Sequence, residues 1–132
     1  MIYIKLFLTS FLTFLILDAI WLGIIAKGFY AKHLAMYLAD EVIWSSAFIF
    51  YIIFNIGLLI FVILPAIEKN SYITLVFYSL LYGLVTFATY DLTNLATIKE
   101  WPAVVTLVDI AYGMFVAFSA SSIAFFSNKY FI

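Results

Sequence analysis

The sequence predicts an all-α integral membrane protein, a four-helix antiparallel bundle with a short interfacial helix after the first span. Hydrophobic residues make up 68% of the 132 residues. Charged residues make up only 10%, against about 25% in soluble domains, and the mean hydropathy is +1.22. Short charged clusters separate four apolar runs, each long enough to cross a hydrocarbon core of roughly 30 Å. We expect a single transmembrane domain over residues 1–132.

The first apolar run, residues 2–26, is predicted to be a retained span and not a cleaved signal peptide. A signal peptide has an apolar region of about 7–15 residues that ends in small residues at the cleavage site. This run is longer, contains Asp18 and has no Ala-x-Ala pattern before Lys27.

Residues 27–41 form the long connection and are expected to include a helix lying in the membrane interface. Tyr30 and Leu34 recur at helical spacing among charged residues, which is typical of an interfacial helix and equally of an ordinary amphipathic connector. Asp40 and Glu41 are expected at the start of the second span, where the helix dipole favours carboxylates.

The other three spans follow with short turns between them. The second is predicted over residues 42–64 and ends before Pro65. The third, residues 71–98, must run antiparallel to the second because the turn is so short. The fourth covers residues 102–127, with Trp101 before it at the level of the lipid headgroups.

Four spans place both ends of the chain on one side of the membrane. The six lysines divide equally between the two sides, and the chain has no arginine. The positive-inside rule therefore does not decide the orientation. We expect the termini to lie in the cytoplasm.

Three aspartates inside the spans are predicted to share one depth. Asp18 and Asp91 lie eight and seven residues before the ends of their runs, and Asp109 lies seven residues after the start of its run. Each is thus about 10–12 Å from the same membrane face. Acids inside spans cost roughly 2.5–3.5 kcal/mol each and face a bundle interior or a wet cavity. We expect a shared polar site near the long connection.

Helical angles predict which faces carry this site. On the third span the polar residues, Tyr90 and Asn94 among them, fall in one arc with Asp91 just beyond its edge. We therefore expect this span to be central. On the fourth span Asp109 shares a stripe with Gly113 and other small residues, of the kind that lets membrane helices approach closely.

Four short strings resemble a known family: LDAIWLG at 17–23, ATYDLTNLAT at 88–97, WP at 101–102 and VDIAYG at 108–113. They look like the small predicted membrane proteins catalogued as domain of unknown function 2177, across essentially the whole chain. Tyr112 departs from a tryptophan associated with that family. The resemblance implies a bacterial four-helix inner-membrane protein and brings no established activity. It also implies a shared polar set of Asp18, Trp21, Asp91, Asn94 and Asp109.

The candidate site therefore combines the three aspartates with polar and aromatic neighbours. No cofactor and no metal are predicted. If a metal were bound, three carboxylates would suit a hard divalent cation such as Mg²⁺, Mn²⁺ or Ca²⁺. The lack of cysteine and the single histidine exclude disulfides, thiolate chemistry and cysteine-rich zinc sites. The ligand-binding or proton-exchanging candidates are Asp18, Trp21, Tyr90, Asp91, Asn94, Asp109 and Tyr112.

Three functions stay open at this point. The first is a small transporter or ligand-binding bundle for a small polar or cationic ligand, expected as a homodimer among membrane lipids. The second is a lipid-modifying membrane enzyme or its accessory subunit, although the sequence favours a protein that is not an enzyme. The third is a structural assembly subunit, in which the acids accept hydrogen bonds and fix the bundle. Nucleic-acid binding is not expected, because the net charge is −1.

Overall fold

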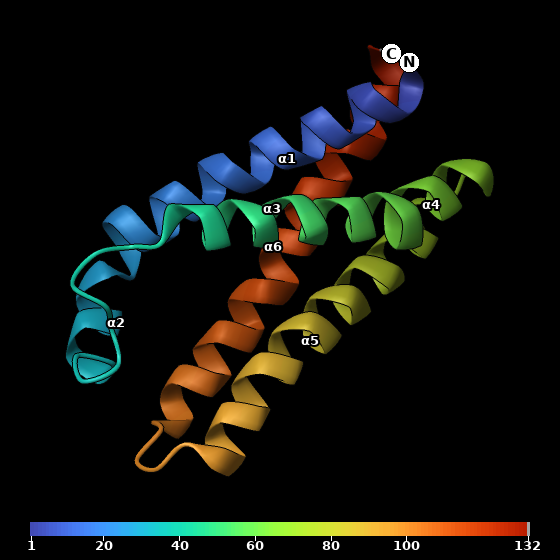
Figure 1. Cartoon of the computed structure of the whole chain (residues 1–132). Helices are drawn as coiled ribbons and strands as arrows, with labels where there is room; N and C mark the ends of the chain where they lie inside the picture. The colour runs from blue at the N-terminus through green and yellow to red at the C-terminus, as the bar shows by residue number, and fades with distance from the viewer. Residues whose placement is uncertain (132) are drawn as a thin grey trace.

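The computed structural model describes residues 1–131, and in them the chain is helical with one long connection (Figure 1). Four stretches are long and apolar enough to cross a membrane: Ile2–Ile25, Trp44–Glu68, Tyr72–Thr97 and Ala103–Tyr130. The predicted all-helical fold with four packed spans is confirmed. In chain order the elements are α1 (Ile2–Ile20), the π-helical η1 (Trp21–Ile25), α2 (Lys27–His33), α3 (Trp44–Leu58), the π-helical η2 (Leu59–Ile63), α4 (Leu64–Glu68), α5 (Tyr72–Thr97) and α6 (Ala103–Tyr130).

The second span does not end before Pro65, as the sequence had indicated, but continues to Glu68. Proline lacks the backbone N–H that an α-helix needs at each interior position, so it ordinarily stops or kinks the helix. Here the wider π-helical turn of η2 precedes it, and the N–H of Leu64 bonds to the carbonyl of Leu59. Pro65 then occupies the first turn of α4, where a missing N–H leaves nothing unpaired.

The long connection is only partly helical. The predicted interfacial helix is present as α2, which ends at His33. Residues 34–43 continue without a regular helix as far as α3. Asp40 and Glu41 lie in this connection and not in the first turn of α3, which contains no acid. That expectation was wrong because α3 begins at Trp44, two residues later than the sequence pattern indicated.

The closest packing in the bundle joins α5 to α6. Gly83 on α5 lies against the backbone of Gly113 and Met114 on α6, so that a Cβ added at Gly83 would stand 2.6 Å from the Met114 Cα. Ala117 and Ala120 continue the same face of α6 and are fully buried. The predicted stripe of small residues on the fourth span is therefore its packing face, as in other close pairs of membrane helices.

The buried face of α5 overlaps the predicted polar arc only in part, since Ser79 and Gly83 belong to that arc and Asp91 lies just beyond it. Ser79, Gly83 and Asp91 are buried on α5, whereas Thr89 and Thr93 are exposed. The threonine hydroxyls explain the difference, since a helix satisfies them internally: the Thr89 Oγ1 donates to the carbonyl of Val85 at 2.5 Å. Such residues need no polar neighbour and can face lipid. Asp91 has no equivalent way to satisfy its carboxylate and is buried.

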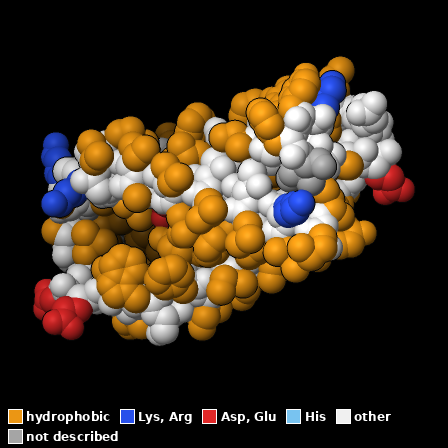
Figure 2. All heavy atoms as spheres, turned by 90° about the horizontal axis from the view of Figure 1, so that it is seen from above, with side chains coloured by type: hydrophobic (Ala, Val, Ile, Leu, Met, Phe, Trp, Pro, Cys, Tyr) orange, Lys and Arg blue, Asp and Glu red, His pale blue; other side chains and the backbone are white. Residues whose placement is uncertain are grey.

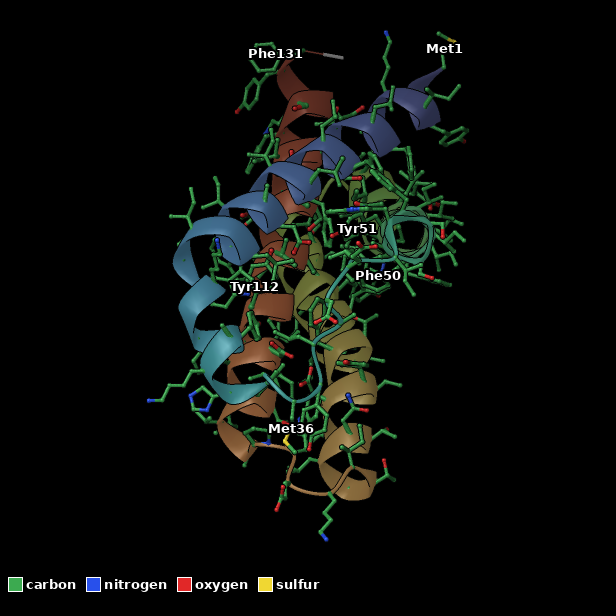
Figure 3. The ribbon with its side chains drawn as sticks, turned by 60° about the vertical axis from the view of Figure 1, so that its left-hand side comes forward. Met1, Met36, Phe50, Tyr51, Tyr112 and Phe131 are labelled. Atoms are coloured by element: carbon green, nitrogen blue, oxygen red, sulfur yellow. The ribbon has the colours of Figure 1, made fainter. Side chains whose placement is uncertain are left out.

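The other two spans cross this pair. In Figure 1, α3 passes in front of α6 at a wide angle, and in Figure 3 it is seen nearly end-on while α5 and α6 run along the page. The C-terminal end of α3 is tied to α5, because the Tyr82 Oη donates to the carbonyl of Phe54 at 2.8 Å. Phe54 also packs against Phe14 of α1, with ring centroids 5.0 Å apart. The N-terminal half of α3 is thereby held away from α5.

The glycine contact gives a first prediction. We expect Gly83→Ala to lower the free energy of unfolding by about 1–3 kcal/mol, because the new methyl group forces the backbones of α5 and α6 apart. Thermal unfolding of the purified protein in detergent measures the effect. Gly23→Ala is the matched control, since nothing lies within 4 Å of a Cβ added there. Equal stability of the two variants would show that α5 and α6 are not closely packed.

Candidate functional site

A cavity of about 880 Å³ lies beneath the N-terminal half of α3, between this half and the helices α1, α5 and α6. Its walls are mostly aromatic and aliphatic, with the three intramembrane aspartates among them. The polar and charged groups of its lining come from six elements, α1, η1, α2, α3, α5 and α6. They are Asp18, Trp21, Lys27, Tyr30, Tyr51, Thr86, Tyr90, Asp91, Asp109 and Tyr112.

Asp18 is held by two tyrosines from two other helices. The Tyr51 Oη on α3 donates to Asp18 Oδ2 at 2.8 Å, and the Tyr112 Oη on α6 donates to Asp18 Oδ1 at 2.9 Å. Both tyrosines are labelled in Figure 3. Hydrogen bonds to a charged group contribute about 1.5–3 kcal/mol each. Asp18 therefore joins α1, α3 and α6, which is the structural role that the sequence had left open for these acids.

Asp109 is tied to the long connection through Tyr30. The Tyr30 Oη on α2 donates to Asp109 Oδ1 and accepts a hydrogen bond from the Trp21 Nε1 at 3.1 Å. Burial raises the pKa of Tyr30 above its usual range, and the contact with Asp109 raises it further. Tyr30 therefore keeps its proton and acts as a donor at any physiological pH. This pair of bonds docks α2 onto the bundle.

The indole of Trp21 forms a wall of the cavity. It stacks face to face on the ring of Tyr112, with centroids 4.5 Å apart and an interplanar angle of 8°. The ring of Phe87 meets Tyr112 edge-on at 6.3 Å. Aromatic faces carry negative charge density and attract cations within about 6 Å.

Asp91 is the acid that the structure leaves without a partner. Its side chain is fully buried, and among residues 1–131 neither carboxylate oxygen has a hydrogen-bond donor. Asp109 lines the same cavity as Asp91. Two ionised carboxylates are both acceptors and repel each other. A proton or a cation between Asp91 and Asp109 relieves that repulsion.

The structure brings six of the seven predicted site residues to this cavity. Asn94 is the exception: it is half-buried and lies outside the cavity lining. The three aspartates do not form one metal site, since no group of three or more His, Cys, Asp or Glu in the described part of the chain is placed to hold an ion.

The chain matches, over residues 3–126, the model of a family described as predicted membrane protein (DUF2177). The chain belongs to this family. No curated protein and no solved structure matches it at a significant level. Membership in the DUF2177 family thus supports a multi-pass membrane protein and says nothing of an activity.

Sequence reasoning missed two residues of this DUF2177 site, Tyr30 and Tyr51. Tyr30 was assigned only to the apolar face of an interfacial helix, and Tyr51 lay unnoticed in the most hydrophobic span. A signal was available for Tyr51: its hydroxyl lies in the apolar part of its span, far from the acid Glu68 at the end, so an acid that it bonds to must lie on another helix. Phenol groups buried in an apolar medium require such partners.

The site gives a second prediction, in which two similar substitutions have opposite effects. Asp18→Asn should lower the free energy of unfolding by about 1–3 kcal/mol, because Tyr51 and Tyr112 lose a charged acceptor. Asp91→Asn should leave stability unchanged or increase it, because it removes a buried charge that has no donor.

Thermal unfolding in detergent between pH 5 and 8 compares the two variants. Asp40→Asn, on an exposed acid in the connection, is the matched control and should have little effect. If Asp91→Asn destabilises the protein as much as Asp18→Asn does, then Asp91 is a structural hydrogen-bond acceptor, and the distinction between the two acids is wrong.

Proposed function

We propose that this chain is a small transporter or ligand-binding bundle that holds a small polar or cationic ligand in its acidic cavity. The observation that carries the proposal is Asp91, a fully buried carboxylate without a donor on the wall of a cavity of about 880 Å³. Ligand pockets commonly measure about 300–1,000 Å³. Keeping an unsatisfied ionisable group within a span is costly, and such groups mark ligand and ion pathways.

The presence of Asp91 and Asp109 in one cavity supports a transport mechanism in which a proton is exchanged for the ligand. Either a proton or the positive group of a ligand can lie between two adjacent carboxyls, and the two exclude each other. Loading of the ligand then releases a proton, and release of the ligand takes one up. Because four helices make a narrow bundle, we propose that transport requires a homodimer.

One observation favours a second candidate, a lipid-modifying enzyme. Tyr30, Asp109 and Asp91 form a continuous series of a hydroxyl donor and two carboxyls along one wall of the cavity. Such a series could donate and accept protons in general acid–base catalysis. Altered membrane lipids after deletion of the gene, without any ligand binding by the purified protein, would favour this candidate.

The transporter proposal is tested by a ligand screen on the purified protein. Amines, quaternary ammonium ions, neutral compounds and anions are compared for thermal stabilisation of the wild type and of Asp91→Asn. A ligand at a hundred times its dissociation constant stabilises the folded state by about 2.7 kcal/mol. We expect positively charged compounds to stabilise the wild type and to lose that effect in Asp91→Asn.

Each hit is then tested for flux in proteoliposomes, with Asp40→Asn as the control that keeps both binding and flux. The absence of stabilisation by every class of compound would reject the proposal. If Asp91→Asn also kept its normal assembly and its normal effect in cells, a structural subunit would be the better description.

We further propose that the protein resides in the bacterial inner membrane with both termini in the cytoplasm. Met1 and Phe131 lie at the same end of the bundle, as four spans require (Figure 3). A C-terminal fusion to green fluorescent protein should fluoresce in a bacterial host, and a fusion to alkaline phosphatase should be inactive. The reverse pattern would place the termini on the outer side.

A further inference from the structure

The mouth of the cavity opens on the flank of the bundle. Figure 2 shows the molecule along its length, with charged side chains gathered toward its two ends. Between these ends the surface is hollowed, the rim of the hollow is hydrophobic, and an acidic side chain is visible inside. Ala47 and Phe50, in the N-terminal half of α3, line the cavity. This half of α3 diverges from α5 and α6 (Figure 1). A mouth on the apolar flank of a membrane protein opens into lipid and not into water.

The charge of the lining selects the ligand. Three acids and a single base, Lys27, contribute to it. Asp18 already accepts two hydrogen bonds from tyrosines. Among residues 1–131, the carboxylate in the lining that still needs a partner is that of Asp91, and Asp109 lines the same cavity. An anion would be repelled by this pair, and a neutral molecule would leave it unpaired.

The remaining walls fit an apolar, aromatic body. Phe14, Phe50 and Phe87 line the cavity together with the stacked pair of Trp21 and Tyr112. Aromatic faces bind organic cations by cation–π attraction, which strengthens as water is excluded. A strongly hydrated inorganic ion would gain little from such walls.

We propose that the ligand is a lipophilic organic cation, which enters from the bilayer through the mouth beside α3 and pairs with Asp91 and Asp109. This inference rests on the proposed function and names its ligand class and entry route. The cation partitions into the membrane, moves laterally into the cavity and places its positive group at the acid pair, with its apolar body against the aromatic walls. Water-soluble cations of the same charge lack this route.

Two ions of matched size and shape test the charge requirement. Tetraphenylphosphonium and tetraphenylborate both partition into lipid and differ in the sign of their charge. Equilibrium binding to the protein in nanodiscs of zwitterionic lipid should be saturable for the phosphonium and absent for the borate. Asp91→Asn should weaken phosphonium binding about tenfold or more, as expected for loss of a buried charge contact. Asp40→Asn should not change it.

The entry route is tested by narrowing the mouth. Ala47→Trp places a large side chain on the cavity wall of α3 and should slow and weaken phosphonium binding. Ala96→Trp adds the same side chain to an exposed position of α5 that does not line the cavity, and it should have no effect. Since both changes lie on lipid-facing or cavity-facing surfaces, circular dichroism and gel filtration check that each variant is folded.

The outcomes separate this inference from the proposed function. Saturable binding of tetraphenylborate, or phosphonium binding that is indifferent to both Asp91→Asn and Ala47→Trp, overturns the inference. If tetraethylammonium, a water-soluble cation, binds and tetraphenylphosphonium does not, the bundle is still a ligand binder, but entry from lipid is wrong. If no compound of any class stabilises the protein, the proposed function and this inference fail together.

Discussion

The structure depends on how three carboxylates are accommodated among apolar spans. Two of them are satisfied by phenols brought from other elements: Asp18 by Tyr51 and Tyr112, and Asp109 by Tyr30. These bonds connect every part of the chain that surrounds the cavity except α5. The acid on α5, Asp91, is the one that receives no such bond. An unpaired polar group in a low-dielectric interior carries a large free-energy cost. That cost distinguishes Asp91, as a candidate binding residue, from the two acids whose hydrogen bonds hold the helices together.

The cavity itself follows from unequal packing between the spans. The absence of a side chain at Gly83 allows α5 and α6 to come into backbone contact, and these two helices form a rigid wall. α3 cannot approach in the same way, because Phe54 and Tyr82 stand between it and α5. From that contact the two helices diverge, and the long connection that precedes α3 spans the space between them (Figures 1 and 3). The contact between Phe54 and Tyr82 thus fixes the point from which α3 and α5 diverge, and so it sets the width of the space beneath α3.

Hydropathy was sufficient to predict the spans, because transfer of long apolar runs out of water dominates every other local preference. The gathering of the three aspartates around one cavity was equally readable, since it needs only the rise of a helix and the span ends. The partners of the acids were not readable, because a hydroxyl on one helix meets a carboxylate on another only once the crossing angles are fixed. Asn94 was misplaced for a related reason: beside it the polar arc consists of Thr93 and Thr97, which are exposed, and the Thr97 hydroxyl donates to the carbonyl of Thr93 within the helix.

Asp109 is bonded to Tyr30 and also lies beside Asp91, so two different parts of the molecule draw on one carboxyl group. Any species that engages Asp109 from the cavity competes with the hydroxyl that docks α2. By thermodynamic linkage the competition is reciprocal: docking of α2 lowers the affinity of the cavity for such a species by the same factor by which the bound species weakens the docking of α2. The long connection is therefore more than a tether between spans. The docking of α2 and the occupancy of the cavity are linked in one equilibrium.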